Sequence, residues 1–371
     1  MFNKRKRANG MKGKSSEFQK KYNEITTSLL NNMYREKNEN IVFSPLSIYM
    51  LLAVMSHATD NNTRKEILKA ISSDEGAEAT LKELFNDIKE MTKDDALLTS
   101  NGIYFNGEIK DSVSEKYIED FKRLFAGKIF ATKSAKNEMN EWISEKSNGM
   151  INDFVTDDIM EALMCMFNVT AFETKWYKPY EEDQVDMGKF HNLDRSTSNV
   201  SMMNSMEHIL VKNTKVKGIV KSYRNCDYSF MALLPNRKGK RALLSCINDL
   251  NLTDVFRTAR DGIVLCMLPK FEYEFETGLK EFCMKSGISE IFSDNADFTP
   301  VTKECLKADK IIHKARIQVN EDGTRAAAIT SMPVFTGIYR EDEIKFDRPF
   351  IYAIMNNTTG LPAFVGVVIS L

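Results

Sequence analysis

The sequence predicts one α+β domain, with helices clustered around antiparallel or mixed β-sheets rather than a doubly wound parallel sheet. The early part of the chain has apolar residues at helical spacing, whereas the C-terminal third has short apolar or alternating runs typical of strands. Over 371 residues there is no internal repeat, low-complexity tract or linker long enough to separate two domains.

Helices are predicted first along the chain. One apolar stripe consists of residues three or four positions apart, namely Phe18, Tyr22, Ile25, Leu29 and Met33. The next helix has a strong start signal, because Ser44 can cap it and Pro45 takes its first position. Further helices fit residues 112–126, 137–148 and 277–287, and Gly287 is placed to end the last of these.

Strands are predicted in the C-terminal third. Four runs have the length and pattern of strands, at residues 263–268, 312–319, 346–355 and 361–369. They do not alternate regularly with helical patterns, and this irregular order is the reason for expecting an α+β class.

Charge and hydropathy exclude two classes of partner. The chain has 51 Lys and Arg against 52 Asp and Glu, a net charge of −1, so no global field draws it onto nucleic acid. No apolar run approaches the roughly 18 to 20 residues of a membrane span. We therefore expect neither a nucleic acid nor a membrane as partner.

Residues 1–15 are expected to form a basic, flexible tail. The run Lys4–Arg7 is not followed by an apolar stretch, so we see no cleavable signal peptide. We expect a cytoplasmic protein, or one secreted without a classical leader or from a processed precursor. A nuclear-localisation or anionic-surface role for the basic run is the alternative to a solvated tail.

Sequence motifs of enzymes are absent. There is no G-x-S-x-G, H-E-x-x-H, G-x-x-x-x-G-K-S/T or G-x-G-x-x-G motif, and no two of the four histidines have metal-ligand spacing. The six cysteines are at least 17 positions apart, so we expect reduced and mostly buried thiols. We expect no catalytic residue, no metal and no cofactor.

The segment from Glu321 to Tyr339 is unusual, because it carries no charge from Ala326 onward. Three alanines favour a helix, but strand formers such as Ile329 and Val334 follow them. Written as a strand, alternate residues from Thr324 form one uncharged face, and Arg325 lies on the other. An ordinary buried strand is the alternative interpretation.

Six segments, in the expected order, resemble motifs of the serpin family. Residues 310–330 resemble the hinge and include Glu321-Asp-Gly-Thr-Arg-Ala-Ala-Ala-Ile-Thr330, and Phe346-Asp-Arg-Pro-Phe-Ile-Tyr-Ala-Ile354 resembles the C-terminal signature. The others are residues 40–48, 168–176, 268–271 and 291–298. The resemblance extends from about residue 16 to the end of the chain.

The resemblance implies a single serpin domain over 16–371, with three β-sheets, eight or nine helices and an exposed reactive-centre loop at about 322–342. It also implies a suicide substrate with a metastable native state. A serine protease cuts the loop and forms an acyl-enzyme, and the loop then inserts into the central sheet and traps the protease covalently. The driving force would be β-strand addition that releases stored strain, a kind of switch for which serpins are themselves the usual example. We expect a monomer that can polymerise on heating.

Three groups of residues acquire roles through the resemblance. The hinge would comprise Glu321, Gly323, Thr324, Arg325, Ala326, Ala327 and Ala328. The shutter, a polar cluster under the central sheet, would comprise Ser44, Pro45, Ser47, Asn168 and His313. The breach, at the point of insertion, would comprise Lys270, Glu321 and Trp176, with an ion pair between the first two.

Some features depart from the inhibitory pattern. Arg325 stands where Glu is common, Ile329 where Ala is usual, and Pro333 removes one hydrogen bond from an inserted strand. Arg325 would face solvent, and Ile329 is compatible with a strand.

The reactive bond is placed by counting. The forward count from Gly323 gives Gly337–Ile338, and the backward count from Pro349 gives Ile338–Tyr339. The forward count is preferred, with Phe335, Tyr339 or Arg340 as alternative anchors. The first two suit a chymotrypsin-like protease, which we favour, and Arg340 suits a trypsin-like one.

Two other functions stay open. The chain could be a non-inhibitory serpin, acting as a chaperone, carrier or storage protein, or a cross-class inhibitor of cysteine proteases. An enzyme is not expected.

Overall fold

The computed structural model describes residues 16–72, 77–106, 112–132, 134–324 and 342–371. The expected tail at residues 1–15 lies outside them. Within the described residues the α-helices are α2 (Glu17–Glu36), α3 (Pro45–Ala58), α4 (Asn61–Ile71), α5 (Ala77–Met91), α6 (Glu115–Phe125), α7 (Lys136–Lys146), α8 (Asp157–Glu161), α9 (Lys240–Asn248), α10 (Leu252–Arg257) and α11 (Lys280–Lys285).

Strands make up most of the remaining structure. They are β1 (Ile41–Phe43), β2 (Leu97–Phe105), β3 (Lys128–Phe130), β4 (Met164–Phe172), β5 (Thr174–Lys175), β6 (Val185–His191), β7 (Thr197–Lys212), β8 (Val216–Ser222), β9 (Tyr228–Pro235), β10 (Arg260–Pro269), β11 (Phe271–Gly278), β12 (Lys310–Val319), β13 (Gly323–Thr324), β14 (Asp342–Lys345), β15 (Phe350–Asn356) and β16 (Pro362–Val368). Short 3₁₀ turns occur at Glu182–Gln184 and Glu290–Phe292.

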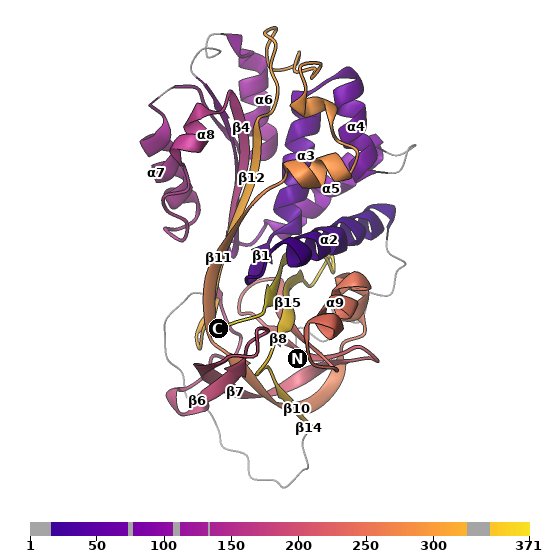
Figure 1. Ribbon diagram of the computed structural model, residues 1–371, viewed down its shortest axis with the longest axis vertical. Coiled ribbons are helices and arrows are strands. Elements are labelled where there is room, and N and C mark those ends of the chain that lie inside the picture. Colours follow the sequence, from indigo (N-terminus) through magenta and orange to yellow (C-terminus); the bar gives the residue numbers. More distant parts are fainter. Residues whose placement is uncertain (1–15, 73–76, 107–111, 133, 325–341) are drawn as a thin grey trace.

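Two sheets organise the molecule. The central sheet has the order β3-β2-β4-β12-β13-β5, and β11 also pairs with β12. The second sheet has the order β1-β16-β15-β9-β8-β7-β10-β14, and β6 also pairs with β7. Figure 1 shows β4 and β12 as long neighbouring strands, with β6, β7, β10 and β14 gathered at one pole of the molecule.

The expected α+β class is confirmed, but the numbers of helices and of sheets differ from those expected. The described residues contain ten α-helices rather than eight or nine. Counted by hydrogen bonds, the strands of the described residues form two sheets rather than the expected three, because β7 pairs with β10 over most of its length and with β8 at Leu210–Lys212. This one long strand joins what would otherwise be separate sheets.

Helix α3 lies at the centre of the fold. The Ser44 hydroxyl caps it by accepting from the Ser47 N–H at 3.2 Å, and Pro45 occupies its first turn as predicted. All its residues except His57 are buried, and it packs against both β4 of the central sheet and β16 of the second sheet. A helix that is apolar all round is suited to such a core position.

A second apolar cluster covers the other face of the central sheet. It joins Trp142 of α7 and Ile159 of α8 to Phe167 of β4. The two helices therefore lie on one side of β4 and β12, and α3 lies on the other (Figure 1).

Candidate functional site

Strands β4 and β12 are direct neighbours in the central sheet. They pair in parallel from Cys165 opposite Lys310 to Thr170 opposite Ala315. Beyond this point β4 runs on to Phe172 and β12 to Val319 without pairing with each other. The two strands are thus paired along most of their length and separate at one end. The junction between them is called the β4–β12 seam below.

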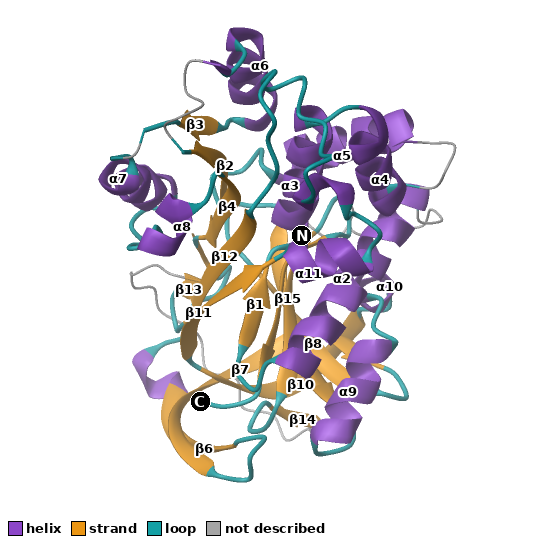
Figure 2. Ribbon diagram, turned by 45° about the horizontal axis from the view of Figure 1, so that its top comes forward, coloured by secondary structure: helices purple, strands orange, loops and turns teal. Residues whose placement is uncertain are grey.

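The described start of the hinge, residues 320–324, occupies this open end and is called the hinge base below. Thr324 is paired on both sides, with Val319 of β12 and with Thr174 of β5, and both pairings are antiparallel. The Gly323 position is closely packed, because a Cβ there would lie 2.2 Å from the Thr174 carbonyl oxygen. Only glycine fits this approach. Figure 2 labels β13 beside β11 and β12.

Three consecutive carbonyls of the hinge base are held by two aromatic residues. The Trp176 indole N–H donates to the Asn320 carbonyl at 2.8 Å, and the Trp176 backbone N–H donates to that of Asp322 at 2.9 Å. The Tyr180 backbone N–H donates to the Glu321 carbonyl at 2.9 Å. The Asn320 side chain closes the turn by accepting from the N–H groups of Asp322 and Gly323, both at 3.1 Å.

The Thr324 side chain points into the protein. It is fully buried, and its hydroxyl shares a hydrogen bond of 2.7 Å with the Tyr223 hydroxyl. The Tyr223 ring stacks on Trp176, with centroids 4.6 Å apart and planes at 5°. Thr324 therefore lies on the inward face that the alternating pattern predicts.

The far side of β5 is fixed by the turn between β8 and β9. The Arg224 N–H donates to the Lys175 carbonyl at 2.8 Å, and the Tyr177 N–H donates to the Ser222 carbonyl at 2.9 Å. The segment that receives the hinge base is therefore held from both edges.

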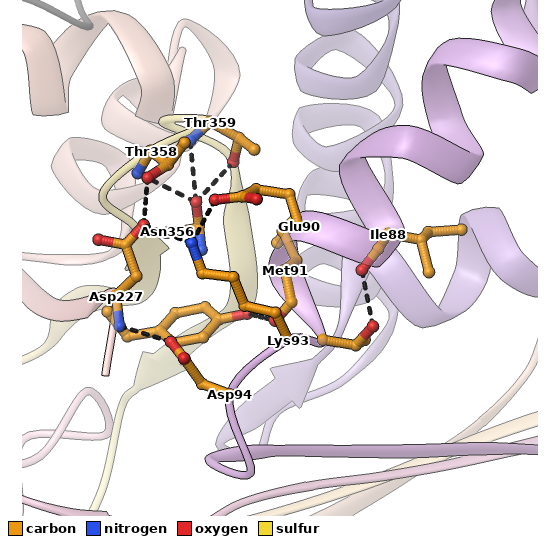
Figure 3. Close-up of polar contacts among 11 residues, drawn as sticks. Ile88, Glu90, Met91, Lys93, Asp94, Asp227, Asn356, Thr358 and Thr359 are labelled. Atoms are coloured by element: carbon orange, nitrogen blue, oxygen red, sulfur yellow. Dashed lines mark hydrogen bonds and ion pairs between the residues drawn. The ribbon is translucent and has the colours of Figure 1, made fainter. Parts of the chain in front are cut away.

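Polar contacts tie the same turn to the end of α5 and to the β15–β16 turn (Figure 3). The Asp227 N–H donates to the Asp94 carboxylate at 2.8 Å, and the Asn357 N–H donates to the Asp227 carbonyl at 2.8 Å. Lys93 forms ion pairs with Glu90 and Asp227, and the bond to Glu90 raises the pKa of the Lys93 ammonium group. These contacts fix the turn that supports β5.

Lys270 and Glu321 form the expected ion pair, with Nζ and Oε2 2.7 Å apart. Their side chains are 29% and 38% exposed, so solvent screens the attraction. Partial burial alone would raise the pKa of the Glu321 carboxyl. The hydrogen bond from Lys270, a backbone hydrogen bond and the charge of Lys270 together outweigh it and hold that pKa below its ordinary value.

The residues assigned to the shutter come together where the start of α3 meets β4 and β12. The Ser44 backbone N–H donates to Nε2 of His313 at 3.0 Å, which joins the start of α3 to β12. His313 stands opposite Asn168 in the β12–β4 register. Both side chains are fully buried.

His313 is held in its neutral form. Burial lowers the pKa of its imidazole from 6.5 to about 3. Since Nε2 accepts the Ser44 bond, the proton of the neutral ring resides on Nδ1. Protonation would require Nε2 to lose that bond inside the protein.

The shutter residues do not satisfy all their polar atoms. Within the described part of the chain, Ser47 Oγ, Asn168 Oδ1 and His313 Nδ1 are buried without a hydrogen-bond partner. The Asn168 amide nitrogen is satisfied by Thr99 Oγ1 at 3.1 Å and Asn101 Oδ1 at 3.0 Å, both on β2. Unpaired buried groups are costly, and these three lie on the elements that flank the β4–β12 seam.

Other predicted site residues lie outside the described residues. They are Arg325 and Ala326–Ala328 of the hinge, the reactive-bond residues Gly337 and Ile338, and the alternatives Phe335, Tyr339 and Arg340. Of the expected loop at 322–342, the structure describes Asp322–Thr324 and Asp342, which begins β14 and pairs with Val264 of β10.

The sequence did not identify several residues that hold the hinge base. These are Thr174, Tyr180, Tyr223 and Asn320. Trp176 was placed at the breach by resemblance, but its two hydrogen bonds were not predicted. A useful signal was the scarcity of tryptophan, of which the chain has two.

Most of the cysteines are buried, as expected. Cys165, Cys246, Cys266 and Cys283 are buried and free, whereas Cys305 is exposed. Among the described residues, no group of His, Cys, Asp and Glu side chains is arranged to hold a metal ion. No helix in the described part of the chain is both long and apolar enough to span a membrane.

Comparison with known proteins identifies relatives along nearly the whole chain. The serpin family model, described as serine protease inhibitor, matches residues 20–371. An alpha-1-antitrypsin-like protein (GS55-MS) of Ictidomys tridecemlineatus is 28% identical over 362 residues, covering 94% of this chain and 87% of that protein. An alpha-1-antiproteinase of Callosciurus caniceps matches with the same identity and coverage.

Solved structures agree with this match. The thermophilic serpin Tengpin in its native state has a TM-score of 0.87 and 29% identity, covering 97% of this chain and 96% of that chain. Thyroxine-binding globulin in complex with thyroxine has a TM-score of 0.85 and 22% identity, covering 96% and 99%, a likeness of fold. The chain belongs to the serpin family of protease inhibitors.

Proposed function

We propose that the chain is a suicide-substrate inhibitor of a serine protease. The protease would cut the loop and form an acyl-enzyme with it, and the loop would then insert between β4 and β12. The catalytic nucleophile belongs to the protease, so the chain itself needs no catalytic residue.

One observation carries this proposal. Thr324 is already paired on one side with β12 and on the other with β5, at the open end of the β4–β12 seam. A cleaved loop could extend from this residue as an antiparallel strand, and β-strand addition would supply its main-chain hydrogen bonds. The unpaired polar atoms of the shutter support the proposal. They make the closed seam less stable, so that less free energy is needed to open it.

The proposed target is a chymotrypsin-like protease, with Gly337–Ile338 as the scissile bond and Phe335 or Tyr339 as alternative anchors. A trypsin-like protease that recognises Arg340 is the second target class. We also propose a monomer that forms loop-to-sheet polymers on heating, since an open seam accepts a strand from another molecule.

Incubation with chymotrypsin, trypsin and a papain-like protease, followed by a denaturing gel, tests the function. An inhibitor gives a band at the summed masses, and chymotrypsin with its nucleophilic serine blocked is the control that must not give it. N-terminal sequencing of the released fragment locates the cut bond. Cleavage with every active protease and no stable complex would instead favour a chaperone, carrier or storage role.

A further inference from the structure

Behind the residues that hold the hinge base lies an ion pair withdrawn from solvent. Lys221 Nζ on β8 and Glu207 Oε1 on β7 are 2.8 Å apart, and their side chains are only 7% and 9% exposed. Among the ion pairs of the described residues, no other has both side chains below a tenth exposed. The Ser205 hydroxyl donates to the same carboxylate oxygen at 2.8 Å.

Lys221 also contacts both aromatic residues that hold the hinge base. Its Nζ lies 4.4 Å from the centroid of the Tyr180 ring and 5.6 Å from that of Trp176. A cation over an aromatic face is attracted more strongly when water is excluded. The buried charge of Lys221 thus contacts the two residues whose N–H groups bind the carbonyls of residues 320–322.

We infer that Lys221, held in place by Glu207, is a positioning residue for loop insertion. It fixes Trp176 and Tyr180, whose N–H groups hold the turn at residues 320–322 while a strand grows from Thr324. The turn must stay in place, because a shift of one residue would bring the opposite face of the new strand inward. This inference rests on the proposed function for its role in inhibition, but the geometry it concerns exists in the uncut protein.

A purely structural role makes a different prediction. Methionine has a similar length to lysine, and apolar residues often replace a buried ion pair without loss of stability when both partners are changed. The double variant Glu207→Gln with Lys221→Met therefore removes the charge while limiting the cost of an unpaired buried group. If packing alone matters, this double variant should hold the hinge base as the parent does.

Hydrogen exchange of the Trp176 and Tyr180 backbone amides tests the inference without any protease, because these amides donate to the hinge base. We expect exchange about ten-fold faster in Lys221→Met and in the double variant, and near-parental exchange in Lys221→Arg, which keeps the charge. The matched control is Lys314→Met, since Lys314 is also buried but pairs with Glu274 and Glu276 on β11. Equal exchange in the double variant and the parent would overturn the inference.

The stoichiometry of inhibition provides the functional arm. With a protease that the parent traps, Lys221→Met should need about two-fold or more inhibitor per protease, because slower insertion lets more acyl-enzyme hydrolyse. Faster amide exchange with an unchanged stoichiometry would contradict the role in insertion. If the parent traps no protease, the proposed function fails, and amide exchange alone decides whether Lys221 positions the hinge base.

Discussion

The hydroxyl oxygens of Thr324 and Tyr223 are 2.7 Å apart inside the protein, at the open end of the β4–β12 seam. Thr324 is fully buried there before any cleavage. The first residue expected to insert is therefore already in a strand position in the uncut chain, and a change at this residue acts on both the native state and the insertion step.

Thr324→Arg is expected to convert the inhibitor into a substrate. A guanidinium at this position must either be buried without a partner or expel the hinge base from the seam, and unpaired buried charge is strongly unfavourable. The protease would still cut the loop, so gels should show cleaved chain with little covalent complex.

Thr324→Val is the matched control for that change. Valine keeps the volume and branching but leaves the Tyr223 hydroxyl without its partner, which costs about 1 kcal/mol. The variant should still trap the protease, with only slightly less covalent complex than the parent. Full trapping by Thr324→Arg would show that Thr324 does not enter the sheet with its side chain inward.

Glu321→Lys is expected to promote polymers on mild heating. It replaces the ion pair with two like charges at the hinge base, while the partly exposed pair itself contributes only about 0 to 1 kcal/mol. Loss of this ion pair makes the seam easier to open but has little effect on the stability of the whole fold. Native gels of parent and variant, heated side by side, measure the polymer yield.

Charge reversal provides the control for this pair. Glu321→Lys with Lys270→Glu restores an opposite-charge contact, so polymer yield should return toward that of the parent. Equal yields in the single variant and the parent at equal temperature would remove the pair from the mechanism.

The native state is expected to lose stability between pH 6.5 and pH 3 through His313. The unfolded imidazole has a pKa of about 6.5, whereas burial lowers it to about 3 in the folded protein. In this window the unfolded state binds the proton and the native state does not, so the stabilising contribution is complete above pH 6.5 and falls with pH. The loss from pH 6.5 to 4.5 is about 2 to 3 kcal/mol.

A difference measurement isolates this effect. Burial raises the pKa of Asp87 to about 6, which acts in the opposite direction by favouring the native state as pH falls. Urea unfolding of the parent and of His313→Gln, at several pH values, cancels that contribution because both contain Asp87. Parallel pH curves for the two proteins would rule out His313 as the source.

Local sequence signals predicted the elements whose ends are set locally. Ser44 and Pro45 start α3 as expected, and Gly287, with φ of +82°, ends the segment after α11. The predicted helix at 277–287 begins too early, because Thr277 and Gly278 extend β11 by pairing with His313 and Ile312. That pairing joins distant residues, and the local pattern does not contain it.

The candidate site was predicted mainly through resemblance. The Lys270–Glu321 ion pair followed from matched positions, and so did the placement of His313 and Ser44 in one polar cluster, but the bond between these two did not. The Lys221–Glu207 pair could not be predicted, because a lysine in Gly218-Ile-Val-Lys-Ser222 has the pattern of an exposed strand residue and its partner is 14 positions away. Such a pair is specified only when the strands are assembled.

Loop insertion can be measured through the thermal midpoint of the protein before and after a single verified cut in the loop, between about Met332 and Arg340. Insertion of the cut loop would complete the central sheet and release strain held in the intact protein. We expect the midpoint to rise by tens of degrees on cleavage. An unchanged midpoint would contradict insertion and would place the chain with serpins that do not inhibit by this mechanism.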